Sequence, residues 1–107
     1  MSLIVNRRDL DFVMYEALDL NKILESEHYA DYDRESLDAM MDLCQSIAEN
    51  QFLPSAGKLD ANEPKFIDGK VETIPELKEA INAYREAGLC TSAYDADIGG
   101  MQLPWMM

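Results

Sequence analysis

Residues 33–54, DRESLDAMMDLCQSIAENQFLP, decide the fold because they carry the most regular helical pattern in the chain. Asp33 is suited to cap the first turn, in which Ser36 follows. Apolar residues then recur every three or four positions, as in a helix with one buried side. We expect the helix to end at Pro54, because proline lacks a backbone donor. The apolar stripe consists of Leu37, Met40, Met41, Cys44, Ile47, Ala48 and Phe52.

Two further helices flank this one in the sequence. Leu10, Val13, Met14, Ala17 and Leu18 predict a helix over residues 8–19, with a short continuation through residues 20–24. Pro75 begins a second regular stripe, and Gly88 is placed to end it in the left-handed conformation.

Residues 55–73 interrupt the helical pattern with prolines and glycines. Asp68 and Gly69 suit the positive backbone angles of a type I′ turn, which predicts a small hairpin. The sequence therefore predicts an all-α fold, a small bundle of three to four helices with a short β-hairpin connector.

Composition limits the function classes. The 107 residues suit one domain with a modest core, and 48% hydrophobic residues are typical of a globular protein. The net charge of −12 argues against nucleic acid and anionic membranes as partners. The sequence has neither an apolar run of about 20 residues nor the pattern of a signal peptide. We expect a cytoplasmic protein.

Few residues offer catalytic or metal-binding chemistry. Cys44 and Cys90 lack the CxxC spacing and are expected to be reduced, structural thiols. His28, the single histidine, has no evident metal-binding partner and is expected to be solvated or to cap a helix. The acidic pairs in residues 31–33 and 95–97 lack the spacing of a calcium loop.

The double glycine at Gly99 and Gly100 matches no phosphate-binding motif. We interpret it as a turn that allows close approach of the backbone, with contact to a cofactor as the alternative. The tail that follows is apolar, and we expect it to form an exposed surface that another polypeptide covers. The apolar residues of this tail are Ile98, Met101, Leu103, Trp105, Met106 and Met107.

Four stretches together carry a resemblance to a known family. Residues 7–20, RRDLDFVMYEALDL, are similar to an N-terminal extension, and residues 32–54 are similar to a first long helix. Residues 66–89, FIDGKVETIPELKEAINAYREAGL, match a hairpin followed by a helix, and residues 84–104 end in the double glycine and Pro104. In this order they resemble the N-terminal domain, with its extension, of a bacterial acyl-CoA dehydrogenase.

The resemblance implies an oxidoreductase of fatty acid metabolism. Such enzymes remove two hydrogens between the α and β carbons of an acyl-CoA thioester, passing a hydride to FAD while a glutamate takes the α proton. A middle β-domain and C-terminal helices hold the flavin, and the glutamate belongs to the C-terminal part. None of those motifs has a counterpart here, so we assign no catalytic, cofactor-binding or metal-binding residue to this chain.

The resemblance also implies a division of the chain. Residues 1–30 would be an N-terminal extension with a helix, and residues 31–107 the helical domain, truncated before the helix that lines the acyl pocket. The leading hypothesis is a structural domain or fragment of a flavoprotein, inactive by itself, whose partners are the remaining dehydrogenase domains. The alternative is a freestanding acidic helical interaction module that self-associates as a homo-oligomer.

Overall fold

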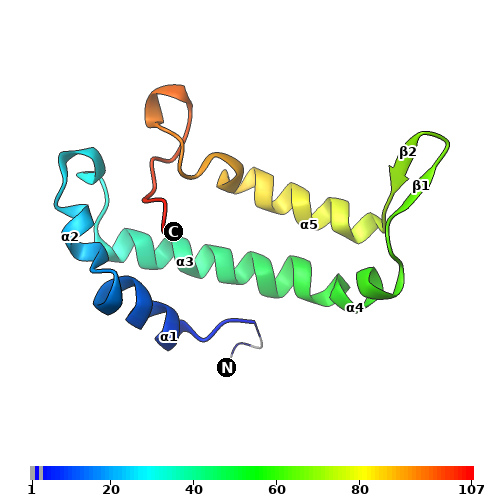
Figure 1. Cartoon of the computed structure of the whole chain (residues 1–107), viewed down its shortest axis with the longest axis horizontal. Helices are drawn as coiled ribbons and strands as arrows, with labels where there is room; N and C mark the ends of the chain where they lie inside the picture. Colours follow the sequence, from blue (N-terminus) through cyan, green and yellow to red (C-terminus); the bar gives the residue numbers. More distant parts are fainter. Residues whose placement is uncertain (1, 3) are drawn as a thin grey trace.

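The computed structural model describes residues 2 and 4–107. Within this range the chain forms helical segments and one antiparallel hairpin (Figure 1). The predicted all-α fold with a hairpin connector is therefore confirmed. In chain order the elements are α1 (Arg7–Asp11), a π-helical stretch (Phe12–Ala17), α2 (Leu20–Leu24), a 3-10 turn (Glu27–Tyr29), α3 (Arg34–Ile47), a second π-helical stretch (Ala48–Phe52), α4 (Leu53–Ala61), β1 (Lys65–Ile67), β2 (Lys70–Glu72), α5 (Pro75–Glu86) and two 3-10 turns (Leu89–Thr91 and Ala96–Ile98).

The first helix occupies nearly the predicted positions. The Asn6 side chain accepts hydrogen bonds from the backbone N–H groups of Arg8 and Asp9, which sets the start of α1. The helix ends two residues before the predicted residue 19, because Asp19 takes a left-handed conformation with φ of 52°. This residue turns the chain into α2.

The long central helix begins as predicted but does not end at Pro54. Asp33 and Ser36 form a reciprocal capping box at the start of α3. The prediction that Pro54 ends the helix was wrong. The Leu53 N–H donates to the Ala48 carbonyl, five residues back. The helix therefore has a π-type hydrogen bond here instead of the usual bond to the residue four positions back. Pro54 then lies in the first turn of α4, where a missing N–H costs little.

The predicted connector and the helix after it are confirmed. Asp68 and Gly69 both have positive φ angles, 50° and 77°, as the hairpin turn requires. Pro75 is the first residue of α5, and Gly88 follows that helix in the left-handed conformation with φ of 78°.

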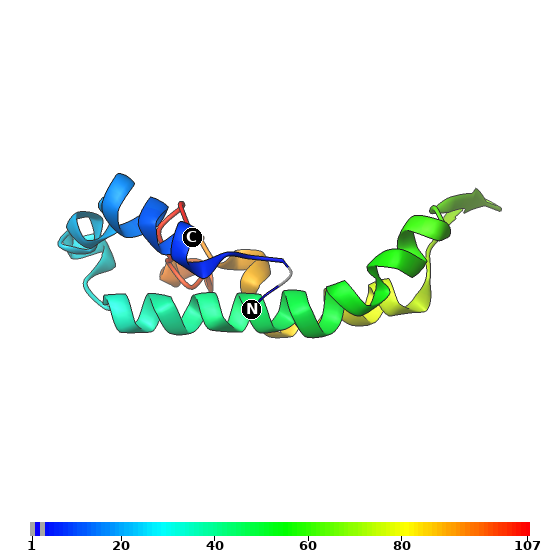
Figure 2. The ribbon, with the colours of Figure 1, turned by 90° about the horizontal axis from the view of Figure 1, so that it is seen from below.

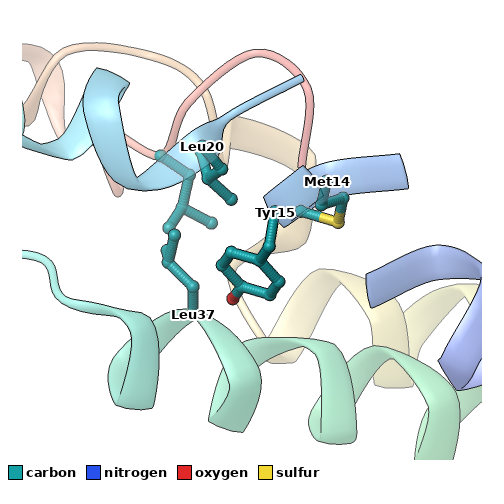
Figure 3. Close-up of a cluster of buried hydrophobic side chains, with 5 residues drawn as sticks. Met14, Tyr15, Leu20 and Leu37 are labelled. Carbon is teal, nitrogen blue, oxygen red and sulfur yellow. The ribbon is translucent and has the colours of Figure 1, made fainter. Parts of the chain in front are cut away.

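The main core lies at one end of the molecule, over the first half of α3. Figure 3 shows Tyr15 and Leu20 meeting Leu37 of α3, with Met14 beside them. Leu20 and Leu37 are fully buried, and Leu103 of the tail completes the cluster. The N-terminal segments, α3 and the tail therefore hold one another together.

The tail folds inward, contrary to the prediction of an exposed apolar surface. Leu103 is only 3% exposed, and its N–H donates to the Ser92 carbonyl. The Tyr32 hydroxyl also donates to the Met101 carbonyl. These bonds reverse the chain over the core, so only part of the predicted surface stays open. Met101, Met106 and Met107 pack partly on the core, whereas Ile98 and Trp105 remain exposed.

The molecule is thin and extended. Its Cα radius of gyration is 16.8 Å and its extents are 51 × 36 × 18 Å. A compact chain of this length has a radius of gyration of about 13 Å. The N-terminal segments and the tail lie over one side of α3 (Figure 2), and the hairpin projects from the opposite end (Figure 1). None of the helices within the described range has the length and apolarity needed to cross a membrane.

Candidate functional site

Tyr15 is the residue with the most strongly perturbed titration, and it joins the first helix to α3. Its hydroxyl donates to Asp38 Oδ1 at 2.6 Å, and the Arg34 guanidinium lies 4.0 Å from its ring centroid. Burial, followed by the hydrogen bond to Asp38, raises the pKa of Tyr15 to about 12. The phenol therefore stays protonated at neutral pH and acts as a structural donor.

An open hollow of about 750 Å³ lies beside this network. Charges of both signs line it, namely those of Arg8, Arg34, Asp9, Asp11 and Glu16. Mixed charges and an open mouth suit solvated ion pairs better than a site that excludes water. The hollow also lacks a nucleophile paired with a base among its described lining residues.

The histidine and the two cysteines remain apart. His28 is exposed, with Nε2 3.9 Å from Asp95 Oδ1, and its carbonyl accepts a hydrogen bond from Gln102 Nε2 at 2.6 Å. Both cysteines have free thiols, and burial raises the pKa of Cys44. Across residues 2 and 4–107, no three His, Cys, Asp or Glu side chains gather as metal ligands.

The backbone of the chain itself occupies the space beside Gly100 in the double glycine. A Cβ atom on Gly100 would lie 1.9 Å from the carbonyl oxygen of Tyr94. Gly99 takes a left-handed φ of 88°, and the Gly100 N–H donates to the Asp95 carbonyl at 3.0 Å. The space that glycine provides is thus occupied by backbone, which confirms the interpretation as a turn.

The most distinctive property of the molecule is its uncovered surface. The accessible area is 7823 Å². A compact monomer of 12.1 kDa exposes about 6,000 Å². The excess of about 1,800 Å² lies within the range of about 1,200–2,000 Å² that specific interfaces bury in total from both partners. Large exposed apolar side chains contribute to it from the N-terminal segment to the tail: Ile4, Phe12, Val13, Leu18, Leu43, Leu53, Phe66, Ile67, Val71, Ile81, Tyr84, Tyr94, Ile98 and Trp105.

Comparison with known proteins identifies the relatives of this chain. A butyryl-CoA dehydrogenase of Syntrophomonas wolfei is 33% identical over 103 residues, covering 92% of this chain. The broad-specificity linear acyl-CoA dehydrogenase FadE5 of Mycobacterium tuberculosis is 32% identical over 102 residues, also 92% of this chain. The chain is a sequence relative of the acyl-CoA dehydrogenases. A second butyryl-CoA dehydrogenase of S. wolfei is 31% identical over 103 residues.

The resemblance noted in the sequence to acyl-CoA dehydrogenases is therefore confirmed. The chain spans only about one sixth of the curated relatives that it matches, 17% and 16% of the first two. This share is consistent with one domain of a longer enzyme. No protein-family model matches the chain. No solved structure matches it either.

Sequence reasoning missed the feature that distinguishes this acyl-CoA dehydrogenase relative, namely its thin shape. The apolar stripes predict which faces are buried, yet Ile81 and Tyr84 of the α5 stripe remain 40% exposed. Helical periodicity marks an apolar face without indicating which polypeptide covers it. For the tail, the sequence indicated the turn at the double glycine, but it did not indicate that the residues after this turn fold back over the core.

Proposed function

We propose that this chain is the helical, N-terminal domain of an acyl-CoA dehydrogenase and that its role is to pack against the rest of that enzyme. The complete enzyme would catalyse α,β-dehydrogenation of an acyl-CoA thioester with FAD. The observation that carries the proposal is the uncovered surface of a chain that matches one sixth of much longer dehydrogenases. A domain that normally lies between other domains keeps apolar side chains on more than one face.

Energetic reasoning supports a structural role. Apolar surface removed from water stabilises an assembly by about 25 cal/mol per Å². If half of the excess of about 1,800 Å² is apolar, covering it contributes on the order of 20 kcal/mol before the costs of ordering. Ordering and association costs offset much of this gross gain, and the remainder favours a domain that is held against the rest of the enzyme.

Neither the double glycine nor the open hollow near Tyr15 fits FAD. The double glycine was the one candidate for a close approach of a cofactor, and the Tyr94 carbonyl occupies the space beside Gly100. The open hollow near Tyr15 is lined by three carboxylates and two arginines, a poor match for the planar, largely apolar flavin ring. We therefore place flavin binding and catalysis in other parts of the complete enzyme.

Four further points belong to this proposal. We propose residues 1–30 as an extension and residues 31–107 as the domain proper, with the remaining dehydrogenase domains as partners. We propose a cytoplasmic location, and two unpaired thiols suit a reducing compartment. The proposed acyl-CoA substrate belongs to the complete enzyme. The net charge of −12 on this chain disfavours nucleic acid and anionic membranes as partners.

A segment exchange tests the proposed function. The segment of the first S. wolfei butyryl-CoA dehydrogenase that matches this chain is replaced by residues 1–107. The matching segment of the second S. wolfei enzyme serves as a control for the exchange itself. Dye reduction by butyryl-CoA and flavin absorbance of the purified protein are the readouts.

We expect the chimera to bind flavin and to oxidise butyryl-CoA, whereas the enzyme lacking the segment does neither. The isolated chain should show no flavin absorbance and no activity. An inactive, flavin-free chimera beside an active control chimera would overturn the proposed function. Flavin bound to the isolated chain would overturn the assignment of cofactor binding to other domains.

A further inference from the structure

The β1–β2 hairpin has no covering element in the described part of the chain. Each strand pairs only with the other, and all six strand residues are exposed. The hairpin projects beyond the end of α4, at the far end of the molecule from the core (Figure 1). A two-stranded hairpin by itself is marginally stable in water. A short hairpin without a cover is a candidate for docking on another surface.

The two faces of the hairpin differ in chemistry. Phe66 pairs directly with Val71, so the two side chains share one face. They are 76% and 67% exposed. The opposite face carries the pair of Lys65 with Glu72, which bear opposite charges, and Ile67 beside a lysine. One face is therefore apolar and the other suits water.

The charge of the hairpin contrasts with that of the whole chain. Residues 65–72 contain two lysines against Asp68 and Glu72, so the hairpin is neutral. The complete chain carries −12. Two copies brought together would repel each other through the −12 charge that each carries outside the hairpin, whereas the hairpin itself adds no repulsion toward a less acidic surface. This observation favours a partner other than a second copy.

The available area points the same way. Stacking the Phe66 and Val71 faces of two copies would bury roughly 500 Å² in total, judged from the size of these side chains. Specific interfaces bury about 1,200 Å² or more. The matched dehydrogenases contain about five sixths of their length beyond the shared segment, which supplies a covering polypeptide of sufficient size.

We propose that the Phe66–Val71 face of the hairpin docks on an apolar surface of another domain of the same dehydrogenase polypeptide. This inference rests on the proposed function and names the contact through which the domain is held. The opposite face of the hairpin remains in water. Contact with that domain would then stabilise the two strands of the hairpin.

The test compares the chimera described above with the isolated chain. The double variant Phe66→Ser/Val71→Ser removes the apolar face, and Ile67→Ser alters the opposite face of the same strand. In the chimera, we expect the double variant to shorten the half-life of activity at elevated temperature by at least about tenfold. The reason is that it removes two apolar side chains from the proposed interface with the other domain. Ile67→Ser should change this half-life less than about twofold.

The isolated chain supplies the second measurement. The urea midpoint of the free chain should be the same for the double variant and the wild type, because both side chains are already exposed there. Hydrogen exchange of the hairpin amides should slow at least about tenfold on going from the free chain to the chimera.

Each outcome separates the two proposals. An active wild-type chimera whose half-life is insensitive to the double variant, or whose hairpin amides exchange as fast as in the free chain, overturns the docking inference alone. An equal loss of stability in the free chain also overturns it, since the residues would then act locally. A chimera that is inactive beside an active exchange control overturns both proposals.

Discussion

Alanine at Gly100 tests the packing of the C-terminal loop most directly. The new Cβ atom would lie 1.9 Å from the Tyr94 oxygen and 2.3 Å from the Tyr94 carbonyl carbon. Real contacts of this kind stay beyond 3.0 Å, so the backbone has to move by at least about 1 Å. The atoms that would move are backbone, which cannot rotate out of the way as a side chain can.

The cost follows from what this backbone holds. The Tyr94 carbonyl accepts a hydrogen bond from the Gln102 N–H at 2.9 Å, worth about 1 kcal/mol. Leu103 is the next residue, and displacement would expose part of its buried side chain at a cost of about 1–2 kcal/mol. We therefore expect Gly100→Ala to lower the free energy of unfolding by about 2–3 kcal/mol.

Two other glycines give matched controls. Gly99 has a φ of 88° but an open surrounding, so Gly99→Ala should lower the free energy of unfolding by about 1 kcal/mol. Gly57 lies within α4 with nothing near its Cβ position, so Gly57→Ala should raise it by about 0.5–1 kcal/mol. Urea unfolding followed by far-UV circular dichroism measures all three. A value for Gly100→Ala within about 0.5 kcal/mol of the wild type would refute the described loop packing.

Three further predictions concern the core, the titration of Tyr15 and association. Leu37→Ala removes a fully buried side chain and should lower the free energy of unfolding by about 2–5 kcal/mol. Leu43→Ala, at an exposed position, should lower it by about 1 kcal/mol or less. Equal losses for the two variants in urea unfolding would contradict the location of the core. Because the pKa of Tyr15 is raised from 10.0 to about 12 in the folded protein, the unfolded chain loses this proton first. The free energy of unfolding should therefore fall as the pH rises from about 10 to 12, and Tyr15→Phe should make that fall shallower; parallel pH profiles of the two proteins would disprove the shift. The isolated chain should self-associate weakly through its uncovered surface, and more strongly at higher salt because screening reduces the repulsion of −12 charges; a monomer at all concentrations and salts in light scattering would argue against this.

Local chemistry predicted the helix boundaries that depend on a few neighbouring residues. The N-cap at Asp33, the turn at Asp68 and the left-handed Gly88 each follow from side-chain and backbone preferences within a few positions. For the same reason the sequence indicated the turn role of the double glycine. These features need no knowledge of the rest of the molecule.

Features that depend on distant contacts were not predictable in this way. Pro54 was expected to end the helix, but a π-helical widening accommodated it, and nothing in the local pattern indicates which of the two occurs. The sequence predicts an uncovered tail because the residues that the tail contacts, Tyr32 and the core near Leu37, lie about 70 residues earlier in the chain. Local sequence patterns do not indicate such distant contacts. The thin shape depends on how all the helices are placed together.

The small thickness of the molecule, 18 Å along its shortest axis, has a thermodynamic consequence. A fold that hides little surface from water gains little new hydration when it unfolds, so its heat capacity of unfolding should lie below the roughly 1.3–1.6 kcal/mol/K expected for this length. Its stability curve would be flat, and its melting transition broad. In a complete enzyme the same segment would have a sharper melting transition, because its unfolding would also expose the surface buried between it and the neighbouring domains.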